Sequence, residues 1–212
     1  MATSQTNTKG VTDGTSGRRR MRGPERKAQL LQVARKVFGA KGFHGVSMED
    51  VAREAGVTKP ILYDHFSSKQ ALYLALLDAD AQTLEDRIRA ALAAPTGNRE
   101  RIRASFQAYF DFVDEHAEGF RLMMQETVGT DDVFRSNVGR VRDRIMQEVS
   151  DLIVRESQGT IDREEADDVA LGLVGMVETA AQHDPGGPTE RRRRTVDTLV
   201  RLAWRGITAL TL

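Results

Sequence analysis

Four side chains near residue 60 have the types and the spacing needed to contact a nucleic acid. Thr58, Lys59, Tyr63 and His65 lie within eight residues of one another, and at helical spacing they make one polar, aromatic-bearing face. Lysine and hydroxyl groups donate hydrogen bonds to phosphates and base edges, which is the chemistry of DNA recognition. The same spacing also fits the outer side of an ordinary helical hairpin, so the face alone leaves both interpretations open.

The elements that would hold this face are two short helices within residues 47–66. Ser47 can cap the first helix, and Asp50 three residues later completes a pair of the capping-box kind. Gly56 stands where that helix must stop, because a left-handed backbone costs glycine little, and Thr58 can cap the second helix. The residues expected to face inward are Met48, Val51, Ala52, Ala55, Ile61, Leu62 and Phe66. This is the helix-turn-helix pattern, whose second helix enters the major groove.

The N-terminal third of the chain is basic, although the whole chain is neutral. Residues 1–66 hold 12 lysines and arginines against 6 aspartates and glutamates, whereas residues 67–212 hold 19 against 25. Such an imbalance favours a polyanionic partner for the first third. A solvated basic face without a partner is the alternative, and the helix-turn-helix in the same third weighs against it.

Two segments precede the helix-turn-helix. Residues 1–23 are rich in Ser, Thr and Gly and end in several arginines, which predicts a disordered basic tail that either follows DNA phosphates or only keeps the chain in solution. From Pro24 an apolar stripe predicts a helix ending near Lys41. Residues 24–70 are therefore expected to form a three-helix DNA-binding domain, because helices this short bury a face only against one another.

A long helix is expected after this domain. Ser67 and Gln70 have the spacing of a second capping box. Apolar residues then recur at helical spacing through residues 72–92, until Pro95 and Gly97 break the pattern. Such a helix would be a rod on the order of 40 Å long, joining the DNA-binding domain to the rest of the chain.

Several short motifs lie at characteristic distances from one another within residues 24–77. They are Val37-Phe38 with Gly42-Phe43, Ser47-Met48 with Val51-Ala52, Ala55-Gly56-Val57-Thr58-Lys59, Leu62-Tyr63 with Phe66, and Lys69 with Leu72. In combination they resemble the tetracycline-repressor (TetR) family of bacterial transcriptional regulators. The resemblance implies an all-α homodimer that binds palindromic double-stranded DNA and carries a C-terminal domain for an inducer. It also implies DNA contacts by Thr58, Lys59, Tyr63 and His65, and phosphate contacts by Ser47 and Lys69.

The remainder, residues 71–212, is expected to be a helical ligand-binding and dimerisation domain. Its predicted helices after the rod are 99–116, 118–127, 133–156, 163–183 and 189–210, which makes about nine helices in the chain. The resemblance implies that the last two form a four-helix bundle with a second copy, and both are apolar on more than one side, which fits such burial. A charge at Leu199 or Trp204 should then disrupt the dimer. Residues 191–194, four arginines, are expected to be a solvated first turn.

An apolar cavity is expected in that domain, although its residues fit a plain core equally well. Aromatic and methionine side chains recur there at helical spacing and could line a pocket. The candidates are Phe106, Tyr109, Phe110, Phe120, Met123, Met124, Met146 and Met176. A small, mostly apolar inducer is the expected ligand.

The sequence gives little support to an enzyme. The chain has no cysteine, and its four histidines are scattered at positions 44, 65, 116 and 183. No glycine-rich phosphate loop, serine elbow or metal-binding histidine pair is present. We therefore expect no catalysis, no cofactor and no metal. The longest apolar run, residues 170–177, is too short to span a membrane, and a cytoplasmic protein is expected.

Two functions remain for the chain. The first is a repressor that a small inducer releases from a palindromic operator. The second is a DNA-binding regulator with no small-molecule ligand. A cavity in the C-terminal domain would distinguish them, because only the first function requires one.

Overall fold

A computed structural model describes residues 23–116, 132–183 and 187–210, and every regular element in these ranges is a helix. The helices are α1 (Gly23–Lys41), α2 (Met48–Glu54), α3 (Lys59–His65), α4 (Lys69–Leu92), α5 (Asn98–Glu115), α7 (Asp132–Glu156), α8 (Arg163–His183) and α9 (Thr189–Leu210). The expected all-α fold is confirmed. The expected helix 118–127 and nearly all of the tail 1–23 lie outside the described residues.

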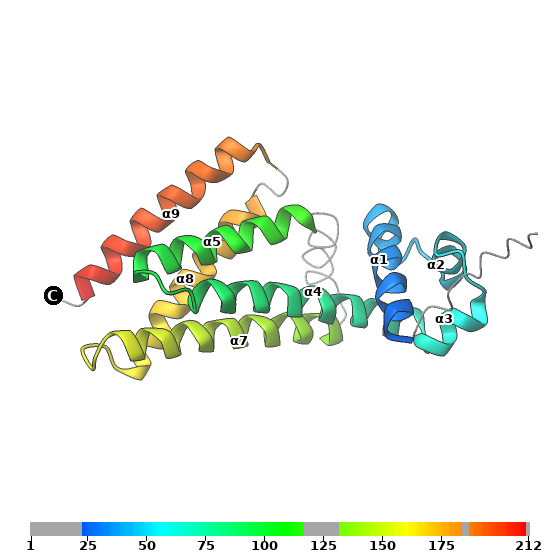
Figure 1. Ribbon diagram of the computed structural model, residues 1–212, viewed down its shortest axis with the longest axis horizontal. Coiled ribbons are helices and arrows are strands. Elements are labelled where there is room, and N and C mark those ends of the chain that lie inside the picture. Colours follow the sequence, from blue (N-terminus) through cyan, green and yellow to red (C-terminus); the bar gives the residue numbers. More distant parts are fainter. Residues whose placement is uncertain (1–22, 117–131, 184–186, 211–212) are drawn as a thin grey trace, which may run out of the picture.

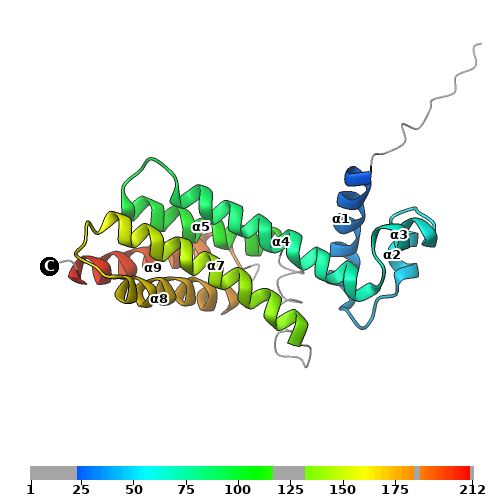
Figure 2. The ribbon, with the colours of Figure 1, turned by 90° about the horizontal axis from the view of Figure 1, so that it is seen from below.

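The molecule is elongated, with a small head at one end and a larger helical body at the other (Figure 1). The head consists of α1, α2 and α3, and the view from below shows α4 leaving it and running into the body (Figure 2). In the body α4 packs against α5 and α7, α8 packs against α7, and α9 packs against α5. None of the described helices is long and apolar enough to cross a bilayer.

Helix α4 belongs to two separate hydrophobic cores. Its first turns place Leu72, Tyr73, Leu76 and Leu77 in the head, around the fully buried Phe38 of α1. The head core thus extends past residue 70 into the long helix. Leu84 and Ile88, further along α4, are buried in the body instead, where they pack with apolar residues of α5, α7, α8 and α9.

The start of α4 differs by one residue from the expected one. Ser68, not Ser67, is the N-cap, and its hydroxyl accepts a hydrogen bond of 3.0 Å from the Ala71 amide. The predicted capping box of Ser67 with Gln70 is therefore wrong. Phe66, which follows α3, is extended and buried, and Ser67 links it to the cap.

Two buried carboxylates of α4 hold its neighbours by ion pairs. Asp80 accepts hydrogen bonds from Arg35 of α1, with the Nε atom 3.1 Å from Oδ1 and 3.3 Å from Oδ2. Glu85 pairs with Arg89 on its own helix at 2.6 Å and with Arg144 of α7 at 2.8 Å. Asp80 thus ties the head to α4, and Glu85 ties α4 to the body.

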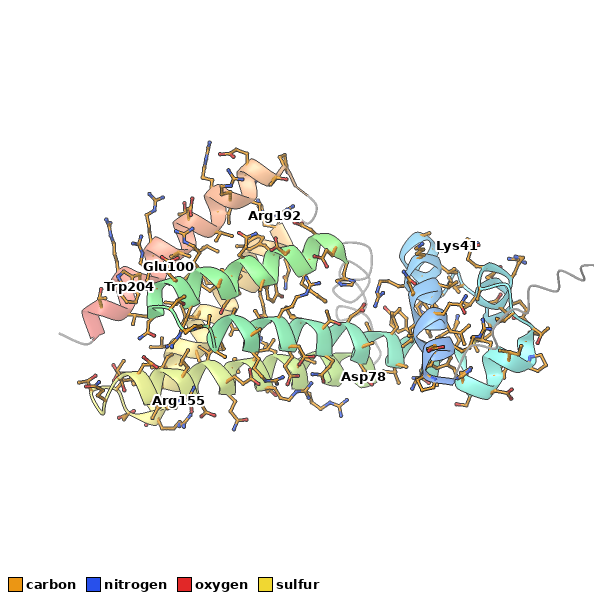
Figure 3. The ribbon with its side chains drawn as sticks, in the orientation of Figure 1. Lys41, Asp78, Glu100, Arg155, Arg192 and Trp204 are labelled. Carbon is orange, nitrogen blue, oxygen red and sulfur yellow. The ribbon has the colours of Figure 1, made fainter. Side chains whose placement is uncertain are left out.

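The first turn of α9 is only partly solvated, contrary to expectation. Arg192 is largely buried, pairs with Asp114 of α5, and donates a hydrogen bond of 2.8 Å to the Gly187 carbonyl. Figure 3 marks it at the point where α9 begins. The ion pair fixes the start of α9 on α5, which accounts for burying one arginine of the four.

Candidate nucleic-acid interface and ligand cavity

Local interactions fix both the start of α2 and the turn that leads to α3. The Ser47 hydroxyl accepts from the Asp50 amide at 3.2 Å, and the Ser47 amide donates to Asp50 Oδ2 at 3.0 Å. The expected capping box is therefore confirmed. Hydrogen bonds from the Ser47 side chain and amide lower the pKa of Asp50 to about 2, so the box stays charged at neutral pH. Gly56 has φ of 63°, in the left-handed region that favours glycine.

The outer face of α3 carries the predicted DNA-contacting side chains. Thr58 is the N-cap, but its side chain makes no capping hydrogen bond, which leaves the hydroxyl available to a ligand. Lys59 is exposed and pairs with Glu49 of α2, and this pairing raises the pKa of Lys59. Tyr63 is 45% exposed, and His65 at the end of the helix is half-buried. The structure thus places these four residues on or beside one exposed helical face.

Ile61 differs from the expectation that it faces inward. It is 39% exposed, whereas the neighbouring Leu62 is fully buried. A helix of only seven residues packs one narrow side against the head, and Ile61 lies about 100° around the axis from Leu62. The hydrophobic pattern alone does not show which of two adjacent apolar residues of so short a helix is buried.

Lys69 occupies a position inside the head rather than on its surface. Its Nζ donates to the Phe43 carbonyl at 2.9 Å and to the Val46 carbonyl at 3.0 Å, and it lies 4.4 Å from the centre of the Phe43 ring. Two of its three N–H groups are therefore used to fix the segment before α2. Its contact with a phosphate stays a prediction, for which the third N–H is available.

Replacing Lys69 by methionine should destabilise the head. The substitution keeps an unbranched apolar stem but leaves two carbonyl groups without their donor, and charged hydrogen bonds contribute about 1.5–3 kcal/mol each. With partial solvent access we expect a loss of about 2 kcal/mol and a Tm lower by roughly 4–8 °C, measured by circular dichroism. The exposed Lys36 of α1 gives the control, because Lys36→Met should leave the Tm unchanged; an equal Tm for Lys69→Met would contradict the anchoring role.

The body contains an apolar cavity of about 230 Å³. It lies between all five body helices, at the end away from the head, where α4 and α7 finish and α5 begins (Figure 1). Aliphatic side chains make most of its wall, among them Ile88, Leu92, Ile102, Ile145, Val149, Leu152, Ile153, Ile161, Leu173, Val174, Val177 and Ile207. Trp204 of α9 closes one side, at the place marked in Figure 3.

A few polar groups lie on this apolar wall. The Ser105 hydroxyl is buried and has no hydrogen-bond partner among the described residues, although unsatisfied buried hydroxyls are rare in folded proteins. Tyr109 is also buried on the wall, and burial raises the pKa of its phenol. At the rim, Arg101 pairs with Glu156 at 3.0 Å. An apolar wall with a few fixed polar groups is typical of a small-molecule site.

The predicted pocket residues are only partly on this wall. Phe106 and Tyr109 line it. Phe110 is buried in the core without reaching the cavity, and Met146 and Met176 are half-buried elsewhere. The other three candidates, Phe120, Met123 and Met124, lie outside the described residues. Sequence reasoning missed Ser105, Arg101 and the cavity position of Trp204, because helical spacing does not show which stripe borders a void.

Helices α8 and α9 each leave a large apolar side chain in solvent. Leu171 of α8 is 49% exposed and Leu202 of α9 is 60% exposed. A Cβ atom added at Gly172 would meet nothing within 4 Å, and one added at Gly175 would meet only a guanidinium nitrogen of Arg142 at 4.0 Å. Nothing that surrounds these glycines in the single chain explains their presence within a helix.

Comparison with known proteins gives the same assignment for both parts of the chain. Residues 30–76 match the family of bacterial regulatory proteins described as the tetR family, and residues 98–206 match the tetracyclin repressor-like C-terminal domain. The transcriptional activator FasR of Mycolicibacterium smegmatis is 35% identical over 190 residues, which are 89% of this chain and 85% of that protein.

Solved structures share the fold over most of its length. A TetR-like transcriptional regulator from Rhodococcus sp. RHA1 has a TM-score of 0.71 and 28% identity, covering 89% of this chain and 99% of that chain. AibR, solved in complex with isovaleryl coenzyme A and operator DNA, has a TM-score of 0.64 and 20% identity, covering 84% and 97%. With both domains matched and a relative similar along nearly its whole length, this chain belongs to the TetR family of bacterial transcriptional regulators.

Proposed function

We propose that this protein binds an inverted-repeat operator as a homodimer and that a small, mostly apolar molecule in the body cavity releases it. The observation that carries the proposal is the cavity itself, with the unpartnered Ser105 hydroxyl on its wall. A plain core would be filled, because close packing in protein interiors leaves few voids larger than a water molecule. The ligand-free regulator, which needs no cavity, is correspondingly less favoured.

The homodimer is supported by the exposed face of α8 and α9. Leu171 and Leu202 would be covered by a second copy, and Gly172 and Gly175 would let its backbone approach closely. Two copies would present two α3 helices to successive major grooves, about 34–36 Å apart. Ser47, Thr58, Lys59, Tyr63, His65 and Lys69 remain the proposed DNA contacts.

The proposed release works through α4. Ile88 and Leu92 at its far end line the cavity, and its first turns belong to the head core. A ligand that pushes these side chains tilts a rod of 24 residues, which moves the head by a few ångströms and spoils the spacing of the two α3 helices. Each tenfold loss of DNA affinity requires about 1.4 kcal/mol of ligand preference for the displaced dimer.

The direction of regulation has two candidates. A protein bound to an operator that overlaps a promoter represses transcription until it is released, and repression is the direction expected above. The name of the relative FasR is that of an activator, and it favours the alternative that the bound protein assists transcription. Transcript levels of the adjacent genes in a deletion strain would rise in the first case and fall in the second.

The ligand class is supported by the cavity and by one neighbour in fold. The wall is almost wholly apolar, so an acyl chain fits its chemistry. AibR was solved with both isovaleryl coenzyme A and operator DNA, which supports the idea that one chain of this fold can hold an acyl compound and DNA. We therefore propose an acyl compound that acts on the protein in the cytoplasm.

Filling the cavity should abolish the ligand response and spare DNA binding. Ser105→Leu adds a side chain that points into the void, so an acyl compound would lose its space while α3 is unchanged. We expect fluorescence anisotropy with the protein's own upstream DNA to show release of the wild type, but not of Ser105→Leu, by octanoate or octanoyl coenzyme A. Ala104→Leu, on the same helix but off the cavity wall, should respond like the wild type.

The ligand-free regulator makes the opposite prediction. In that case octanoate, octanoyl coenzyme A and a wider panel of apolar acids should leave the DNA affinity of the wild type unchanged, even at concentrations that raise its Tm. Ser105→Leu would then behave like the wild type in every titration, and the release mechanism would be wrong.

A further inference from the structure

Helices α8 and α9 carry exposed charges of opposite sign. Glu164 and Asp168 lie one turn apart near the start of α8, and Arg201 and Arg205 lie one turn apart near the end of α9. All four side chains are exposed. Among the described residues none of them has an oppositely charged group within ion-pair distance, and Arg201 donates only to the Thr198 hydroxyl, at 3.2 Å.

These charges lie beside the apolar residues that the single chain leaves in solvent. Asp168 is three residues before Leu171, and Arg205 is three residues after Leu202, so each charge is one helical turn from an exposed leucine. Other charged residues of α8 and α9 are held in ion pairs with α7 and α5. The unpaired charges therefore belong to sides of the two helices that the rest of the chain does not neutralise.

The carboxylates and the arginines lie at the same end of the body. Figure 1 shows α8 beginning, and α9 ending, in the part of the body away from the head. Figure 3 marks Trp204, which lies between the two arginines in sequence, near that end. A dimer that presents two heads to one DNA has its two-fold axis running from head to body. Rotation about such an axis keeps every residue at its height, so the start of α8 in one copy is level with the end of α9 in the other.

We infer that the two copies of the proposed homodimer recognise each other through ion pairs between the start of α8 and the end of α9. Helix α8 runs toward the head and α9 runs away from it (Figure 1), which reverses the order of the charges. Glu164 thus pairs with Arg205 of the partner subunit, and Asp168 pairs with Arg201 of the partner subunit. This inference rests on the proposed homodimer and names the contacts that select the partner.

A second copy of the chain suits these charges better than another partner does. An acidic protein or a nucleic acid would neutralise the arginines and leave the carboxylates facing like charge, and a basic protein would do the reverse. A symmetric copy neutralises both sets at once, and each pair forms twice. Complementary charges at an interface act mainly on specificity, because a wrong partner brings like charges together. The pairs would thus keep this chain from assembling with other regulators of the same fold.

The test reverses each set of charges and asks which chains assemble. The α8 variant is Glu164→Lys with Asp168→Lys, and the α9 variant is Arg201→Glu with Arg205→Glu. The two full-length variants are co-expressed, one with a mass tag, and native mass spectrometry counts the mixed and unmixed dimers. The control replaces the α9 variant by Arg99→Glu with Arg194→Glu, which makes the same change in net charge at exposed positions of α5 and of the start of α9.

The expected result is a strong preference for the mixed dimer. Each variant alone places like charges together at two symmetric sites, so its homodimer should dissociate about 10–100-fold more readily than the wild type. The mixed dimer restores opposite charges at both sites, so about nine-tenths of the dimers should be mixed, against about half for random assembly. The preference should shrink in high salt, because exposed charges are screened. The α8 variant with the control should give the random proportion.

Three other outcomes would contradict the inference. Random proportions from the two reversed variants would show that the charges do not face one another, although the homodimer would stand. An equal preference for the mixed dimer with the control would assign the effect to net charge. A wild type that stays monomeric would remove the proposed homodimer itself. Should a double variant fail to fold, as judged by circular dichroism, Glu164→Lys with Arg205→Glu in the other chain gives the same comparison with a smaller preference.

Discussion

Replacing both Lys59 and Tyr63 by alanine is expected to remove sequence-specific DNA binding while the protein stays folded. Each side chain lies on the exposed face of α3, and a contact to a base or phosphate is worth about 1–3 kcal/mol. The proposed homodimer would lose each contact twice, which sums to roughly 4–12 kcal/mol. That range spans the usual gap between specific and non-specific binding, about 4–10 kcal/mol. Anisotropy titration with operator and scrambled DNA should give equal, weak affinities.

The stability of the double variant is the necessary control. Lys59 makes only a surface ion pair with Glu49, and such pairs contribute about 0–1 kcal/mol, so the Tm should stay near that of the wild type. Lys36→Ala removes a charge from the exposed side of α1 and should weaken binding only slightly. Normal operator binding by the Lys59 and Tyr63 variant would show that α3 is not the recognition helix.

A glutamate in place of Leu202 should divide the proposed homodimer into monomers. Leu202 is the most exposed large apolar side chain described, at 60%. A carboxylate there would be buried without a partner at the interface, at a cost of about 3–5 kcal/mol per unpaired charge. The change occurs twice in a symmetric dimer. Light scattering should then report the 23.5 kDa of one chain.

A glutamate on a solvent-facing helix position provides the comparison. Ala90→Glu on α4, where the side chain is exposed, should keep the dimer mass. Trp204, which the sequence suggested as an interface position, is a poorer choice because it lines the cavity. A dimeric Leu202→Glu protein, together with a dimeric Leu171→Glu protein, would place the interface on another face.

The head could be predicted in detail because its signals are local. The capping box of Ser47 and Asp50 and the left-handed Gly56 each depend on residues within one turn, so the sequence carries the whole interaction. The predictions for the head fail where the structure depends on residues beyond the local turn. Ser68 rather than Ser67 caps α4, after the extended and buried Phe66, and Lys69 binds carbonyls of a segment more than 20 residues earlier.

The body could be predicted only as a set of helices. Helical periodicity identifies the stripe of Phe106 and Tyr109, but whether a stripe meets another side chain or a void depends on how α9 lies against α5. For the same reason the sequence does not predict the charged surface groove between α5 and α9. Arg99 and Arg103 precede Arg201 by roughly 100 positions, and only tertiary packing brings their charges together.

The two cores that α4 connects also govern how the protein unfolds. Helices α2 and α3 have seven residues each, well below the roughly 12–15 at which an isolated helix is even marginal in water. They persist because α4 completes their core through Leu77, and α4 is itself held in the body by Glu85 and by the apolar residues that follow it. Melting the body would release α4 and with it the support of the head, so the chain behaves as one cooperative unit rather than two. A compound in the cavity would therefore raise the free energy of unfolding of the DNA-binding head without touching any of its atoms.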